Sequence, residues 1–118
     1  VLYGPKDWKD LPVAVLNGTK ENGIAGNTKS ILRRFGVNAK YAGNALAESL
    51  ADTTWYAVQP DSNELINVLK QMIPGKVTDQ IPEEYKQNPK MDGVKIILEL
   101  GEDSKKSIQK LDILEPSL

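Results

Sequence analysis

A glycine-studded turn between an apolar run and an amphipathic stretch is the part of this sequence most suggestive of chemistry. It lies within VAVLNGTKENGIAGNTKSILRRFG, residues 13–36, and this layout is typical of loops that hold phosphate at a helix N-terminus. A P-loop needs GxxxxGK followed by Ser or Thr, because the lysine reaches the phosphates and the hydroxyl holds magnesium. Gly18 and Gly23 have that separation, but Ile24 stands where the lysine belongs. Ala25 stands where the hydroxyl belongs. The pattern therefore favours a simple turn between strand and helix over a phosphate-binding loop.

Catalytic groups are scarce elsewhere in the chain. There is no cysteine and no histidine, which excludes zinc sites of the usual ligand set and catalysis by either side chain. The serines therefore lack a histidine base. The acidic pairs Glu83-Glu84 and Glu102-Asp103 favour a solvated surface, because neighbours in sequence do not place two acids across a substrate. We expect no catalytic residue, no cofactor and no metal site in this chain.

The charge balance argues against nucleic acid as a partner. The chain carries 15 basic and 16 acidic residues, for a net charge of −1, so it has no overall field that would attract a polyanion. RNA-binding sheets of this general kind stack bases on aromatic residues of two strands. Trp55 and Tyr56 could serve one of them, but VAVL offers no aromatic residue for the other. The sequence also lacks an apolar run of the ~20 residues that a membrane span requires.

Alternating strand and helix patterns account for most of the chain. Residues 1–12 are predicted to be a lead-in linker. Strands are predicted at residues 13–16, 37–41, 53–58 and 94–100, and helices at residues 24–35 and 62–73. Gly36 directly follows the first helix, where a C-cap favours a residue that can adopt positive φ. The segment 76–92 is polar with two prolines and reads as a long loop, and residues 104–118 read as a C-terminal tail.

This order, β-α-β-β-α-β, predicts the fold class. The economical arrangement is α+β and ferredoxin-like: a four-stranded antiparallel sheet with two helices on one face. At 118 residues the chain fits one domain, which we place at residues 13–103. The other face of the sheet would then be open to a ligand.

The last predicted strand indicates which residues line that open face. Lys95, Ile97 and Glu99 share it, because alternate residues of a strand point to opposite sides. Trp55 would lie there as well, where an exposed indole suits stacking on a sugar ring. Tyr56 could instead be the outward residue, which would place Trp55 in the core. The candidate ligand-binding residues are therefore Lys40, Trp55, Lys95, Ile97 and Glu99.

Several short stretches follow one another in an order that resembles a known family. They are VAVLNGTKENGIAG, Leu32, Phe35-Gly36, Val37, Asn44-Ala45, the strand at Thr54, and Leu100-Gly101-Glu102-Asp103. Together they resemble the LytR C-terminal domain, which lies downstream of the catalytic part in many LytR-CpsA-Psr cell-envelope proteins. The resemblance covers about residues 12–103. The segment 76–92 looks longer than the family's usual connection.

The resemblance implies a location and a role. It implies a non-catalytic accessory domain of an extracytoplasmic protein in a Gram-positive-type envelope, with the glycopolymer-transferring catalytic domain outside this chain. We expect any membrane anchor to lie upstream. The domain would bind or position at cell-wall glycan, glycopolymer or an envelope protein. The family's historical name as transcriptional attenuators implies the alternative, a regulatory or nucleic-acid-binding module.

Overall fold

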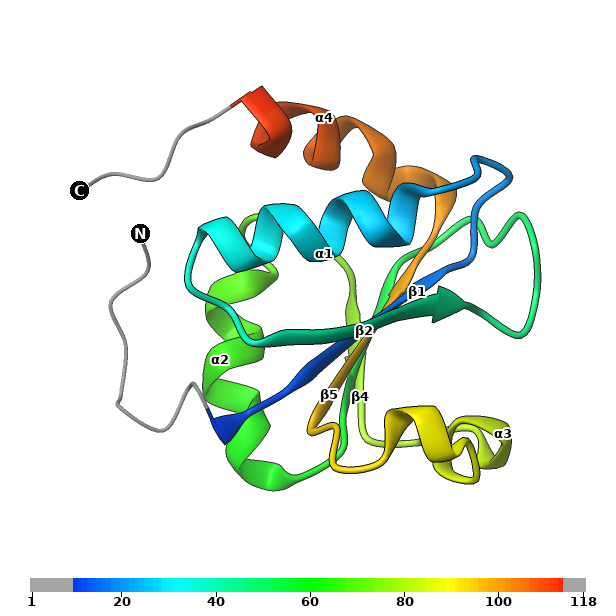
Figure 1. The fold of residues 1–118 in the computed structure, drawn as a ribbon, viewed down its shortest axis with the longest axis vertical. Coiled ribbons are helices and arrows are strands. Elements are labelled where there is room, and N and C mark those ends of the chain that lie inside the picture. The colour runs from blue at the N-terminus through cyan, green and yellow to red at the C-terminus, as the bar shows by residue number, and fades with distance from the viewer. Residues whose placement is uncertain (1–9, 114–118) are drawn as a thin grey trace.

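The computed structural model describes residues 10–113 as one mixed sheet with helices on one face and a folded connection on the other (Figure 1). The strands are β1 (Val13–Asn17), β2 (Ala39–Asn44), β3 (Thr54–Ala57), β4 (Lys76–Thr78) and β5 (Ile96–Leu100). The α-helices are α1 (Ile24–Arg34), α2 (Asn63–Leu69), α3 (Glu83–Lys86) and α4 (Lys105–Ile113). Short 3-10 turns occur at η2 (Pro60–Ser62), η3 (Pro89–Met91) and η4 (Glu102–Ser104).

The α+β class is confirmed, but the four-stranded antiparallel ferredoxin-like sheet is wrong. The strand order is β2-β1-β5-β3-β4. β1 pairs in parallel with both β2 and β5, β3 pairs in parallel with β4, and only β3 and β5 are antiparallel. The reason is that the α1 crossover returns β2 directly beside β1, as in a βαβ unit. A ferredoxin-like sheet would place another strand between them.

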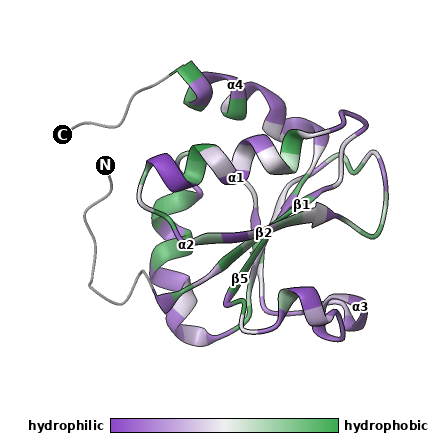
Figure 2. Ribbon diagram, in the orientation of Figure 1, coloured by the Kyte–Doolittle hydropathy of each residue, from purple (hydrophilic) through white to green (hydrophobic). Residues whose placement is uncertain are grey.

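The main core lies between the sheet and helices α1, α2 and α4. Figure 2 shows hydrophobic residues along β5 and α2, while the connecting loops are mainly hydrophilic. Trp55 is fully buried in this core, and its indole Nε1 donates to the Ile73 carbonyl at 2.9 Å. Of the two alternatives for Trp55, its place on an open face is therefore wrong and its place in the core is confirmed. The side chains of β3 alternate so that Trp55 faces the helices and Tyr56 faces away from them.

Helix α1 ends where the sequence predicts. Gly36 has a φ of 90°, in the left-handed region that glycine adopts without a steric penalty. Its N–H donates to the Arg33 carbonyl, and the N–H of Val37 reaches back to the Leu32 carbonyl. This pair of bonds is the Schellman motif. The positive φ predicted for Gly36 is confirmed.

The second face of the sheet is covered, not open. The covering segment, residues 76–92, contributes β4, α3 and η3 and crosses beneath the sheet (Figure 1). Its Tyr85 and Met91 are buried in a second apolar cluster against Ala14, Leu16 and Ile97. A mostly polar stretch can do this because three of its apolar residues, Tyr85, Met91 and Ile81, pack against the sheet, whereas Val77 stays exposed. The expectation of an open face was wrong for that reason.

The sequence analysis placed both ends of the chain outside the domain, but the described parts of these ends pack into it. Residues 105–113 of the expected tail form α4, whose Ile108 and Leu111 are buried in the main core. Leu11, assigned to the linker, is buried there too. The remainder of the linker (1–9) and of the tail (114–118) lies outside the described residues.

Candidate functional site

Strands β1 and β2 both end in asparagine, and their ends lie side by side. Asn17 and Asn44 are register partners in the parallel pair. The loops that follow them, residues 18–23 and 45–53, project together beyond the right-hand end of the sheet in Figure 1. We call this region the carboxyl edge. Loops at the carboxyl ends of parallel strands are where open sheets of this kind bind ligands.

Asn17 organises this edge from within. Its Oδ1 accepts from the Thr19 backbone N–H at 2.8 Å and from the Thr19 hydroxyl at 2.7 Å, while its Nδ2 donates to the Glu21 carbonyl at 2.8 Å. Because both polar atoms of the amide bond to the loop, the main role of Asn17 is to fix the loop.

Two glycines allow the loop to pass close to its neighbours. The N–H of Gly18 donates to the Leu100 carbonyl at 2.9 Å, and an added Cβ there would lie 2.6 Å from that same oxygen. Gly23 has a φ of 83° at the start of α1, with no side-chain cap on the helix. Both glycines therefore allow the turn between β1 and α1, the role that the sequence favours over phosphate binding.

Around Asn44 the carboxyl edge is hollowed on two sides. One hollow of about 380 Å³ is lined by Asn17, Thr19, Lys20, Asn22, Asn44, Ala45, Leu46 and Glu48. A second of about 330 Å³ is lined by Asn17, Gly23, Ala25, Gly26, Ala42, Gly43 and Asn44. Because both share Asn17 and Asn44, we treat them as one feature, the Asn44 trough. Each volume is within the ~300–1,000 Å³ range of ligand pockets.

Several polar side chains of the trough take part in no hydrogen bond or ion pair within residues 10–113. Asn22 and Asn44 are exposed, and neither amide has a hydrogen bond within residues 10–113. Lys20 and Glu48 line the same hollow, and neither takes part in an ion pair in the described chain. The trough thus presents two free amides, one ammonium group and one carboxylate.

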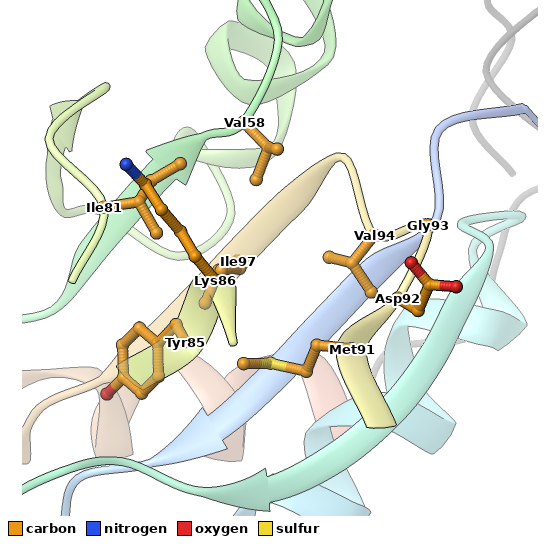
Figure 3. A pocket seen from close by; sticks show the side chains of 9 residues that line it. All are labelled: Val58, Ile81, Tyr85, Lys86, Met91, Asp92, Gly93, Val94 and Ile97. Atoms are coloured by element: carbon orange, nitrogen blue, oxygen red, sulfur yellow. The ribbon is translucent and has the colours of Figure 1, made fainter. Parts of the chain in front are cut away.

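A smaller, more apolar groove of about 200 Å³ lies between the covering segment and the sheet (Figure 3). It is lined by Val58, Ile81, Tyr85, Lys86, Met91, Asp92, Gly93, Val94 and Ile97. The ammonium group of Lys86 is paired with Glu83, with Nζ 3.7 Å from Oε1. The groove therefore offers an apolar floor with few unpaired polar groups.

Beside this groove, a buried carboxylate is held by two tyrosines. Glu99 is only 8% exposed. It accepts from the Tyr85 hydroxyl at 2.6 Å and from the Tyr56 hydroxyl at 3.3 Å, and the Leu46 N–H donates to the Tyr85 oxygen at 3.0 Å. Burial, with the charge of Glu99, raises the pKa of Tyr56 to about 12. Burial and the bond to Glu99 also raise the pKa of Tyr85. Both phenols stay protonated at neutral pH, so the arrangement is suited to holding the covering segment and not to nucleophilic or base chemistry.

The five residues predicted to bind ligand do not form one surface. Ile97 and Glu99 point away from the helices, as alternation indicates, but both are buried under the covering segment. Trp55 lies on the opposite side of the sheet. Lys40 is exposed, and its Nζ donates to a backbone carbonyl of the covering segment at 2.7 Å. Lys95 is half-buried just before β5. Ligand contact by the two lysines stays a prediction.

The carboxyl edge was missed because the predicted fold separates β1 from β2. With a strand between them, Asn17 and Asn44 would not meet. The signal available in the sequence was an asparagine after each of two strand patterns that one helix joins. Both asparagines also belong to the stretches that resemble the family. In the described residues there is no cluster of three acidic side chains that could hold a metal ion. None of the helices in residues 10–113 is long and apolar enough to cross a membrane.

Fold and site together define an α+β domain with a mixed sheet, both faces covered, and a polar trough at one edge. Residues 10–103 match the family model described as LytR cell envelope-related transcriptional attenuator, and the chain belongs to that family. The family is one of non-catalytic, cell-envelope-associated C-terminal domains. The comparisons with curated proteins and with solved structures find no match.

Proposed function

We propose that this chain is an extracytoplasmic accessory domain that positions its parent protein at the cell wall, with the Asn44 trough as the contact. The parent would be a glycopolymer-transferring envelope protein of a Gram-positive-type bacterium, anchored in the membrane by a segment outside this chain. The contact would be to wall glycan, to glycopolymer or to an envelope protein.

The observation that carries this proposal is the meeting of two stretches at one edge. VAVLNGT and Asn44-Ala45 both contribute to the family resemblance, and the parallel pairing of β1 with β2 brings them together. Asn17 and Gly18 have evident roles in the loop, but the exposed side chain of Asn44 makes no hydrogen bond within residues 10–113. A polar side chain that lines a hollow and leaves its hydrogen-bonding groups unused there is a reasonable ligand contact.

Sedimentation with purified walls tests the proposal. The folded chain should pellet with insoluble wall material, and Asn44→Ala should lower the bound fraction while leaving the melting temperature unchanged. Asn67→Ala is the matched control, because Asn67 is an exposed asparagine on α2 with no hydrogen bond within residues 10–113. If the wild type stays in the supernatant at every wall concentration, wall binding is wrong.

The family description gives one reason to consider transcription, since it names an attenuator. A regulatory module would bind nucleic acid, for which a net charge of −1 offers no general attraction. A mobility-shift assay with duplex DNA at low salt separates the two functions. We expect no shift, and a salt-dependent shift together with absent wall binding would favour the regulatory module.

A further inference from the structure

The charge of the Asn44 trough distinguishes between the ligands that a wall contains. Lys20 and Glu48 are the charged residues that line it, so the formal charges cancel. A site for a polyanion needs a surplus of lysine or arginine, because most of the affinity comes from opposite charge. A carboxylate in the lining opposes such a ligand. The trough is therefore poorly suited to phosphate-rich glycopolymers.

The hydrogen-bonding groups of the trough suit a different chemistry. The free amides of Asn22 and Asn44 each present an N–H donor and a carbonyl acceptor. An acetamido group presents the same two functions in reverse, so an asparagine amide can both donate to its oxygen and accept from its N–H. Sugar hydroxyls can use the remaining positions, including the carboxylate of Glu48. No lining residue is aromatic, so stacking contributes nothing and the affinity depends on these bonds.

The shape indicates a chain-like ligand. The two hollows flank Asn44 and share it, so a linear oligomer could place successive units on either side of one amide. A compact monomer could fill only one of them.

We infer that the Asn44 trough takes a neutral glycan strand carrying acetamido groups, at least two sugars long, in preference to an anionic glycopolymer or a protein. This rests on the proposed wall-binding function and adds the class of ligand to it. Asn44 contacts the strand at the junction of the two hollows, and Asn22 contacts it in the larger one.

Oligomers of N-acetylglucosamine, from the monosaccharide to the hexasaccharide, are the probe. Titration is followed by NMR amide shifts of the labelled chain. The monosaccharide should bind most weakly, the affinity should rise with the second and third sugar, and the shifts should concentrate in residues 17–23 and 42–48. Asn44→Ala should weaken binding about tenfold, which is the loss of one to two hydrogen bonds. Asn67→Ala should bind like the wild type.

Salt and wall composition separate this inference from its competitors. Binding to a neutral strand should change less than twofold when NaCl rises from about 0.05 M to about 0.5 M, whereas binding to a polyanion should fall at least tenfold. Walls stripped of both protein and anionic polymer should still bind the chain. If stripping abolishes sedimentation, or Glu48→Gln strengthens binding to intact walls, the ligand class is wrong although wall positioning stands. If intact walls do not bind, both proposals fail.

Discussion

Replacing Tyr85 with phenylalanine tests how the covering segment is held. The substitution keeps the ring of this residue, which is only 4% exposed and whose ring meets that of Tyr56 edge-on with centroids 6.1 Å apart. It removes the hydroxyl that donates to Glu99 at 2.6 Å and accepts from the Leu46 N–H at 3.0 Å. Glu99 then keeps one tyrosine contact, at 3.3 Å.

The magnitude follows from those two bonds. A hydrogen bond to a charged acceptor contributes about 1.5–3 kcal/mol and a neutral one about 1 kcal/mol. Allowing for partial relaxation, we expect Tyr85→Phe to lower the free energy of unfolding by about 3 kcal/mol. For a domain of roughly 100 residues this corresponds to a fall of about 15 °C in melting temperature.

Urea unfolding and amide hydrogen exchange are the assays. Exchange should accelerate in residues 79–92 before it accelerates in β1 and β5, because the covering segment loses its attachment while the main core is unchanged. Tyr41→Phe is the control, since Tyr41 packs against the same cluster and its hydroxyl has no hydrogen bond within the described chain. A loss below about 0.5 kcal/mol for Tyr85→Phe, or one equal to that of the control, would refute the reasoning.

Three further substitutions and a change of pH have defined outcomes. Gly36→Val should destabilise the fold by about 1–2 kcal/mol, because a β-branched residue would be forced to a φ of 90°; an unchanged melting temperature would contradict this. Gly26→Ala should stabilise α1 by about 1 kcal/mol, since nothing lies within 4 Å of the added Cβ. Gly101→Ala should destabilise the fold, because its Cβ would collide with the backbone of Asp52. Equal melting temperatures for Gly26→Ala and Gly101→Ala would contradict both expectations. Stability should fall as pH rises above about 10, because Tyr56 loses its proton near pH 10 when unfolded but near 12 when folded; urea midpoints that stay flat from about pH 9 to about pH 11 would exclude this.

Local sequence patterns predicted the elements with strong periodicity. They failed for elements whose structure depends on pairing with a neighbouring strand. Helix α1 and its glycine cap followed from apolar spacing and the position of Gly36. β4 is three residues long and pairs with β3 from within a polar stretch. A strand that short exists because the neighbouring strand offers unpaired groups, here the Thr53 carbonyl that accepts from the Lys76 N–H at 3.0 Å. No pattern in three residues carries that information.

The candidate site was harder to predict than the fold, because it depends on which strands are neighbours. Alternation correctly placed Ile97 and Glu99 on one face, but it could not reveal that Tyr85 and Met91 would cover them. Fourteen residues separate Tyr85 from its partner Glu99 in sequence, and their contact depends on how the covering segment turns back. Side chains at a strand end are positioned by sheet order, which short-range patterns leave open.

Coverage of both faces also decides where a ligand can approach this domain. Helices α1, α2 and α4 lie over one side of the sheet, and the covering segment lies over the other. Neither face of the sheet is therefore open to a ligand, which leaves the ends of the strands and the groove beside the covering segment as places of approach. Of these ends, the carboxyl edge combines a braced loop with unused polar groups: both polar atoms of the Asn17 amide bond within the loop, while the amide of Asn44, its register partner, has no hydrogen bond within residues 10–113. Under the proposed function, one asparagine would hold the edge in shape so that the other can meet the ligand, which is the preorganisation that a specific site needs.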